Sequence, residues 1–186
     1  MDAIKLLKDD HATMKGLFKK FEQAGDRAHK TKRRLVDQMI EDLSVHASIE
    51  EQIFYPGVRE MVAGTEDIVL ESLEEHHIVK WTLNELEQMQ PQDERFDAKV
   101  TVMIESVRHH IEEEEKEMFP QVRKALKPAQ LRDLGERMER AKAIAPKRPH
   151  PRSPDEPPAN LVAGPVAAAL DVGKRAVGRV ARRRTG

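Results

Sequence analysis

The chain has 186 residues and no cysteine, which excludes disulfide bonds, thiolate zinc sites, iron–sulfur clusters and cysteine nucleophiles from this sequence. Its formal net charge of −1 hides two oppositely charged parts, because residues 145–186 carry +6 and residues 1–144 carry −7. The composition therefore predicts one acidic globular domain, large enough to bury a core, followed by a basic, proline-rich tail.

Residues 1–144 show helical periodicity throughout. Charged residues make up 35% of the chain, and apolar residues recur every three or four positions without the alternation typical of strands. In chain order, the expected helices span about residues 4–25, 35–64, 65–90 and 93–118, and a shorter fifth helix spans about 128–143. Four long helices joined by short connections pack as antiparallel neighbours, so the sequence predicts an all-α, up-down-up-down four-helix bundle.

Polar residues interrupt the apolar stripes of these helices. Each long helix places one histidine in the middle of its stripe, and the second and fourth add a glutamate one turn later. The six residues are His11, His46, Glu50, His76, His110 and Glu114. Polar groups on a core face are costly unless something satisfies them. A bound metal would satisfy them, and a buried network of hydrogen bonds between His and Glu is the alternative.

The sequence also repeats itself at an offset of 64 to 65 residues. Residues 9–22 align with residues 74–87, and residues 46–59 align with residues 110–123. The alignment superposes the histidines and glutamates of the first half on those of the second half. Two such helix pairs packed about a pseudo-twofold axis would bring four His and two Glu together.

This spacing permits a dinuclear metal site. Residues four apart in a helix lie on one face, so His46 points the same way as Glu50 and His110 the same way as Glu114. The two carboxylates would bridge two ions and the four imidazoles would cap them, two for each ion. Imidazole and carboxylate donors without thiolate suit Fe, Mn or Zn.

The order His, His-x-x-x-Glu, His, His-x-x-x-Glu over four helices resembles the hemerythrin-like HHE cation-binding domain. The resemblance covers about residues 1–125 and includes an aromatic-Pro pair after each Glu-Glu. It implies that the six residues bind a non-heme di-iron centre with oxo or hydroxo and carboxylate bridges. It also implies handling of dioxygen, peroxide or nitric oxide, for sensing or for redox detoxification, including peroxidase-like, oxidase-like or nitric-oxide-reducing activity.

One position departs from the oxygen-carrying members of that family. Those proteins have five histidine ligands, two of them one turn apart on the third helix. Here Lys80 stands one turn after His76. A fifth histidine is therefore missing, and we expect a redox or peroxide-handling role rather than oxygen carriage.

Several assignments remain open at this level. His77 or His109 could replace the neighbouring histidine as a ligand, although the apolar stripes and the repeat both favour His76 and His110. Storage or buffering of iron or another divalent metal without redox turnover is an alternative function. A scaffold recruited through the tail is a third.

Three other side chains close to the predicted ligands have two interpretations each. Glu51 and Glu115 would either accept a hydrogen bond from a histidine N–H or lie on the surface. Tyr55 could be a redox side chain, but core or rim packing is the preferred interpretation.

The tail, residues 145–186, contains seven of the eleven prolines and ends in a basic segment. We expect it to be disordered, and its charge would suit an anionic surface or an acidic partner rather than sequence-specific binding of nucleic acid. The sequence begins without a secretory signal, and no apolar run reaches the ~18 to 20 residues of a membrane span. The expected location is therefore cytoplasmic, and the sequence makes no prediction of oligomeric state.

Overall fold

The computed structural model describes residues 1–152, which form helices and no strands, so the predicted all-α class is confirmed. The helices are α1 (Ala3–Glu22), α2 (His29–Ile49), α3 (Tyr55–Met61), α4 (Glu66–Gln88), α5 (Phe96–Glu113), α6 (Phe119–Ala125) and α7 (Pro128–Lys142). Two short π-helical segments, η1 (Glu50–Phe54) and η2 (Glu114–Met118), join α2 to α3 and α5 to α6.

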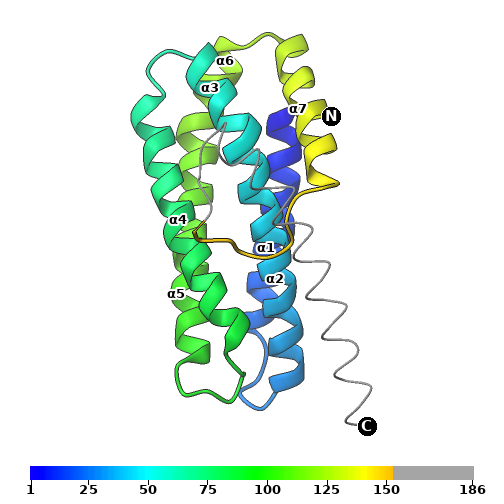
Figure 1. Ribbon diagram of the computed structural model, residues 1–186, viewed down its shortest axis with the longest axis vertical. Coiled ribbons are helices and arrows are strands. Elements are labelled where there is room, and N and C mark those ends of the chain that lie inside the picture. Colours follow the sequence, from blue (N-terminus) through cyan, green and yellow to red (C-terminus); the bar gives the residue numbers. More distant parts are fainter. Residues whose placement is uncertain (153–186) are drawn as a thin grey trace.

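The four long helices lie side by side, and the chain runs along them in alternating directions (Figure 1). Helix α1 packs against α2 and α5, and α4 packs against α2 and α5, so the four helices enclose a common interior. Helix α7, the predicted short fifth helix, packs against α1 and α2 at the end of the molecule where α3 and α6 lie.

The interior contains two apolar clusters with a polar layer between them. One cluster lies towards α3, α6 and α7 and includes Leu7, Phe54 and Met138, and the other lies towards the opposite end and includes Phe18, Met39 and Leu83. Burial of each large apolar side chain contributes about 1.5–3 kcal/mol to stability. The apolar clusters can therefore offset the cost of holding charged groups between them.

The two π-helical segments occur at matching positions of the internal repeat. The amide of Tyr55 donates to the carbonyl of Glu50, and the amide of Phe119 donates to the carbonyl of Glu114, each across five residues. Pro56 and Pro120 follow directly, and neither has an amide hydrogen to donate. The helices therefore widen before each proline, as π-bulges at functional sites do.

Gly135 allows α7 to approach the backbone at the start of α1 closely. An alanine Cβ there would lie 2.8 Å from the amide nitrogen of Ala3 and 2.9 Å from the carbonyl carbon of Asp2, and closer still to the carbonyl of Met1. We expect Gly135→Ala to destabilise the protein by about 1–3 kcal/mol, because the backbone at the start of α1 must move. Denaturant unfolding measures this loss. Gly16→Ala is the matched control, since a Cβ at Gly16 meets nothing within 4 Å and should stabilise α1 by ~0.5–1 kcal/mol. Equal effects of the two changes would contradict this account of the close approach.

The predicted tail lies mostly outside the described residues, which end at residue 152. Within the described part, Lys147 lies 2.5 Å from Glu41 on α2, and Arg148 forms an ion pair with Glu87 on α4. None of the helices in residues 1–152 combines the length and apolar character needed to cross a membrane.

Candidate metal centre

The structure brings the six predicted site residues together in the polar layer of the bundle. They come from α1, α2, η1, α4, α5 and η2, and each is at most 5% exposed: His11, His46, Glu50, His76, His110 and Glu114. Packing of the four long helices therefore places residues that are distant in the sequence on one interior surface.

The six side chains form two groups that share one carboxylate. His11, His46, Glu50 and Glu114 form the first group, and His76, His110 and Glu50 form the second. Within each group the potential ligand atoms all lie within 4.8 Å of one another. Glu50 Oε2 lies 3.1 Å from His46 Nε2 and 3.4 Å from His76 Nε2. Glu50 is thus positioned between the two pairs of imidazoles.

Each of the four histidines has a carboxylate beside its outer ring nitrogen, Nδ1. The pairs are His11 with Glu115 at 2.9 Å, His46 with Asp10 at 3.6 Å, His76 with Glu51 at 3.0 Å and His110 with Glu75 at 2.7 Å. An ionised carboxylate only accepts hydrogen bonds, so in His11, His76 and His110 Nδ1 carries the proton and Nε2 presents its lone pair to the interior. Histidines that bind metals are oriented by carboxylates in the same way.

Several inward-facing atoms of this cluster have no hydrogen-bond partner. They are Nε2 of His11, Nε2 of His46, both carboxylate oxygens of Glu50 and Oε2 of Glu114. In addition, His76 Nε2 and His110 Nε2 lie 3.1 Å apart, so that two lone pairs face each other. A buried polar atom without a partner costs about 1–3 kcal/mol. Bound cations would satisfy these atoms at once, and this donor set fits iron, manganese or zinc.

The protonation states favour the same conclusion. Burial, followed by the charge of Glu114, raises the pKa of Glu50 well above its usual range. Burial lowers the pKa of His46 to about 4 and also lowers the pKa of His76. Burial disfavours the ionised form of Glu114, but the surrounding imidazoles, His110 first among them, hold its pKa below the usual range. His46 and His76 are therefore neutral at physiological pH, which is the form that binds metals.

Acidification is expected to weaken metal binding in two stages. Protons compete first for His110 and Glu50, because the pKa of each is raised above its usual value, and they compete for His46 only near pH 4. The conditional affinity for Zn²⁺ should therefore fall gradually from pH 8 to 5 and steeply near pH 4, as measured by competition with a chelator. An affinity that stays constant from pH 8 to 5 would contradict the raised pKa values of His110 and Glu50.

The Tyr55 hydroxyl also lies in this cluster, which the packing interpretation did not include. The hydroxyl donates to Glu114 Oε1 at 3.0 Å and lies 3.4 Å from both His76 Nε2 and His110 Nε2. The repeat places Phe119 at the equivalent position, where its ring stacks on His11 at 5.8 Å between centroids. The two halves thus differ by one oxygen atom beside the imidazoles.

Neither alternative histidine joins the cluster. The His109 side chain is 64% exposed and lies 3.4 Å from Glu113. His77 accepts a hydrogen bond from Trp81 near the surface, at 3.1 Å. The geometry therefore favours His76 and His110, as the helical stripes did.

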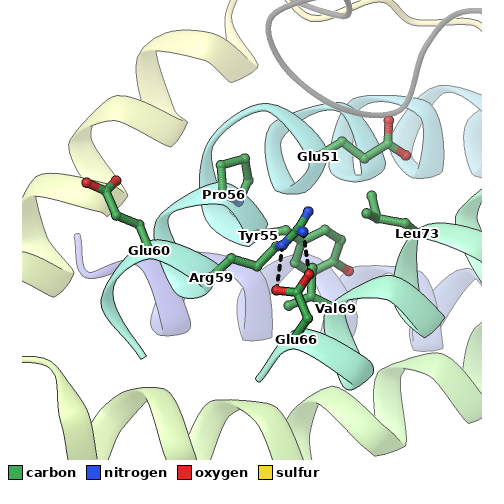
Figure 2. Close-up of a pocket in the computed structure, with 8 residues that line it drawn as sticks. All are labelled: Glu51, Tyr55, Pro56, Arg59, Glu60, Glu66, Val69 and Leu73. Carbon is green, nitrogen blue, oxygen red and sulfur yellow. Dashed lines mark hydrogen bonds and ion pairs between the residues drawn. The ribbon is translucent and has the colours of Figure 1, made fainter. Parts of the chain in front are cut away.

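Two hollows adjoin the cluster. A small enclosed cavity of about 20 Å³ is lined by His46, His76, His110 and Lys80 among apolar side chains. A larger surface pocket of about 430 Å³ lies above Tyr55 and Glu51, and Arg59 donates to Glu66 within it at 3.0 Å (Figure 2). Glu51 and Tyr55 line the surface pocket and also contact the buried histidines, so they connect it to the cluster.

Comparisons with known proteins agree with this geometry. The family model described as the hemerythrin HHE cation binding domain matches residues 2–122. An uncharacterised hemerythrin-like protein of Schizosaccharomyces pombe is 29% identical over 164 residues, which cover 87% of this chain and 79% of that protein. A protein of Nostoc sp. named DNA nickase is 25% identical over 138 residues, which cover 74% of this chain but only 38% of that protein.

A solved structure shares the fold. The crystal structure of a hemerythrin HHE cation binding domain-containing protein from Mycobacterium kansasii superposes with a TM-score of 0.63. The match covers 77% of this chain and 88% of that one, at 22% sequence identity.

Proposed function

The chain belongs to the hemerythrin HHE cation-binding domain family and so binds metal ions, and from this premise we propose that its His/Glu cluster holds two non-heme iron ions. In this proposal His11 and His46 bind one ion, and His76 and His110 bind the other. Glu50 and Glu114 would bridge them. Glu50 belongs to both ligand groups, and Glu114 Oε2 lies 3.2 Å from His11 Nε2 and 3.7 Å from His110 Nε2 of the other group.

Tyr55 supplies a further oxygen donor in the half that contains His76 and His110. Its hydroxyl lies 3.4 Å from both of their Nε2 atoms. A phenolate oxygen there would replace the fifth histidine ligand of oxygen-carrying relatives. The equivalent residue in the other half, Phe119, has no oxygen atom to donate.

We propose that the centre handles peroxide or nitric oxide, or reduces dioxygen, rather than carrying dioxygen reversibly. Two bound irons would supply the capacity to bind such a ligand and to exchange electrons with it. The observation that carries the proposal is the enclosed cavity of about 20 Å³ beside His46, His76 and His110. A cavity of this size holds about one water-sized molecule, so it selects small ligands by volume.

The chain itself contributes orientation and exclusion of water. The carboxylates on the outer nitrogens orient the imidazoles of His11, His76 and His110 with Nε2 pointing inward. The two apolar clusters flank the polar layer on both sides, and the cavity wall is apolar apart from Lys80 and the three imidazoles. A small ligand would therefore meet a fixed set of nitrogen and oxygen atoms in largely apolar surroundings.

Metal analysis with absorption spectroscopy tests this function. Protein produced in iron-replete medium is expected to contain about two irons per chain, since two of the three groups of potential ligands in the described part of the chain are buried in the bundle, whereas the group of Glu75, His109 and Glu113 is not. Its charge-transfer absorption should shift on addition of azide, and it should consume hydrogen peroxide. Bound metal with no azide response and no peroxide consumption would instead support storage or buffering. Deletion of residues 146–186 should leave all three properties unchanged, because the six predicted ligands lie outside the tail.

A further inference from the structure

Lys80 is a buried lysine in the wall of the small cavity. It is 8% exposed, and the rest of the cavity wall is formed by His46, His76, His110 and apolar side chains. Burying an ammonium group costs several kcal/mol before any partner is counted. Its position beside a cavity for small ligands therefore suggests a role in what the cavity binds.

The ammonium group of Lys80 pairs with the carboxylate of Glu51. Lys80 Nζ lies 3.0 Å from Glu51 Oε2 and 2.9 Å from Glu51 Oε1, and Glu51 Oε1 also lies 3.0 Å from His76 Nδ1. Lys80 lines the cavity, whereas Glu51 lines the surface pocket shown in Figure 2. The positive member of the pair is therefore the nearer one to the cavity.

The internal repeat provides a natural comparison. Lys15 pairs with Glu115 at 3.0 Å, and Glu115 contacts His11 Nδ1 at 2.9 Å, so the same three-residue chain occurs in the other half. There, however, the Lys15 side chain is 46% exposed and does not line the cavity. Orienting a histidine through a carboxylate thus does not require a buried lysine. The burial of Lys80 must have another consequence.

We propose that Lys80 makes this cavity a site for small monoanions, such as azide and hydroperoxide, in preference to neutral diatomic molecules. The inference rests on the proposed function, because the anion would bind the metal centre from the cavity. A positive charge a few ångströms away in a low-dielectric interior stabilises an anion far more than it would in water. The remaining wall of the cavity is apolar apart from the three imidazoles, and the carboxylate that partly offsets the charge of Lys80, Glu51, does not line the cavity.

Azide affinity of the iron-loaded protein tests the proposal through binding rather than activity. Lys80→Met keeps the length of the side chain and removes its charge, and we expect it to weaken azide binding roughly tenfold or more. Lys15→Met is the matched control and should change azide affinity less than about twofold, because Lys15 is largely exposed to solvent. Nitric oxide binding to the reduced protein should change less than about twofold in Lys80→Met, because the ligand is neutral.

Glu51→Gln separates an electrostatic role from a structural one. Glutamine keeps an oxygen to accept from His76 and removes the negative charge, so azide binding should become tighter. If the pair only oriented His76, both Lys80→Met and Glu51→Gln would weaken azide binding, and that result would overturn the proposal. Should Lys80→Met fail to load iron, Lys80→Gln is titrated in its place with the same two outcomes.

The outcomes also separate this inference from the proposed function. Wild-type protein that binds no metal would overturn both. Wild-type protein that holds iron and binds azide, with unchanged affinity in Lys80→Met, would overturn the role of Lys80 alone.

Discussion

Glu50→Ala is expected to reduce the metal content from about two ions per chain to less than one, because Glu50 is the residue that both ligand groups share. Its carboxylate lies within 3.4 Å of Nε2 atoms from both halves, at His46 and His76. Removing it takes a donor from each ion at once. Metal analysis of the purified variant, after removal of loosely bound ions, measures the effect.

The metal content of two other glutamate variants serves as the comparison for Glu50→Ala. Glu114→Ala should lose less metal than Glu50→Ala, because Glu114 Oε2 lies 3.2 Å from His11 Nε2 but farther, at 3.7 Å, from His110 Nε2 of the other group. Glu112→Ala should keep the full metal content, because its side chain is 58% exposed and pairs only with Lys116 in the described contacts. Unchanged stoichiometry in both Glu50→Ala and Glu114→Ala would show that these carboxylates do not bridge metal ions.

Tyr55→Phe is expected to remove the phenolate-to-iron charge-transfer absorption of the ferric protein while most of the iron remains bound. The hydroxyl is the only atom lost, and it lies 3.4 Å from His76 Nε2 and from His110 Nε2. Because Tyr55 is the only tyrosine in the chain, a visible phenolate band cannot arise elsewhere in it. The metal-free variant should also unfold with about 1–3 kcal/mol less free energy, since the buried carboxylate of Glu114 loses a donor.

Moving the hydroxyl to the other half provides the control. Phe119 occupies the position equivalent to Tyr55, and its ring stacks on His11 at an interplanar angle of 9°. The double variant Tyr55→Phe, Phe119→Tyr should therefore regain a phenolate band, now from the half that contains His11. A wild-type spectrum without this band, or a band that persists in Tyr55→Phe, would mean that Tyr55 does not bind iron.

The helical class and the convergence of the six site residues could be predicted, because both follow from the spacing of residues along an α-helix. Apolar residues at three- and four-residue spacing identify the helix faces, and His46 and Glu50 lie one turn apart on the same face. The repeat then related the two halves without any structural information. The same reasoning favoured His76 and His110 over His77 and His109, which each lie about 100° from the core stripe of their helix, but it left the two alternatives open.

The place of Tyr55 could not be predicted from a regular helical period. Tyr55 is five residues after Glu50, and five residues in an α-helix turn a side chain well away from the first residue. The π-helical segment η1 widens the turn to five residues, so that Tyr55 lies one turn after Glu50 on the same side of the helix. The sequence does contain two features that point to this π-helical segment. Pro56 follows Tyr55, and an aromatic-Pro pair occurs at the same place in each repeat. They indicate a local change of helix type because Pro56 has no amide hydrogen to continue the α-helical pattern.

The burial of Lys80 also could not be predicted from the sequence, for a different reason. Its spacing from His76 predicts that it lies on the same face as the ligands, but a long charged side chain commonly extends to solvent. Lys15 does so at the equivalent position of the repeat, with 46% of its side chain exposed. Only the packing of α4 against its neighbours distinguishes the buried lysine from the exposed one.

The central claim is that two metal ions lie between the four histidines and share Glu50. Anomalous diffraction from crystals of iron-loaded protein, recorded at the iron absorption edge, tests it most directly. Two anomalous peaks are expected inside the bundle, one next to His11 and His46 and one next to His76 and His110, with Glu50 between them. A single peak, peaks confined to the surface, or an interior without anomalous signal would contradict it.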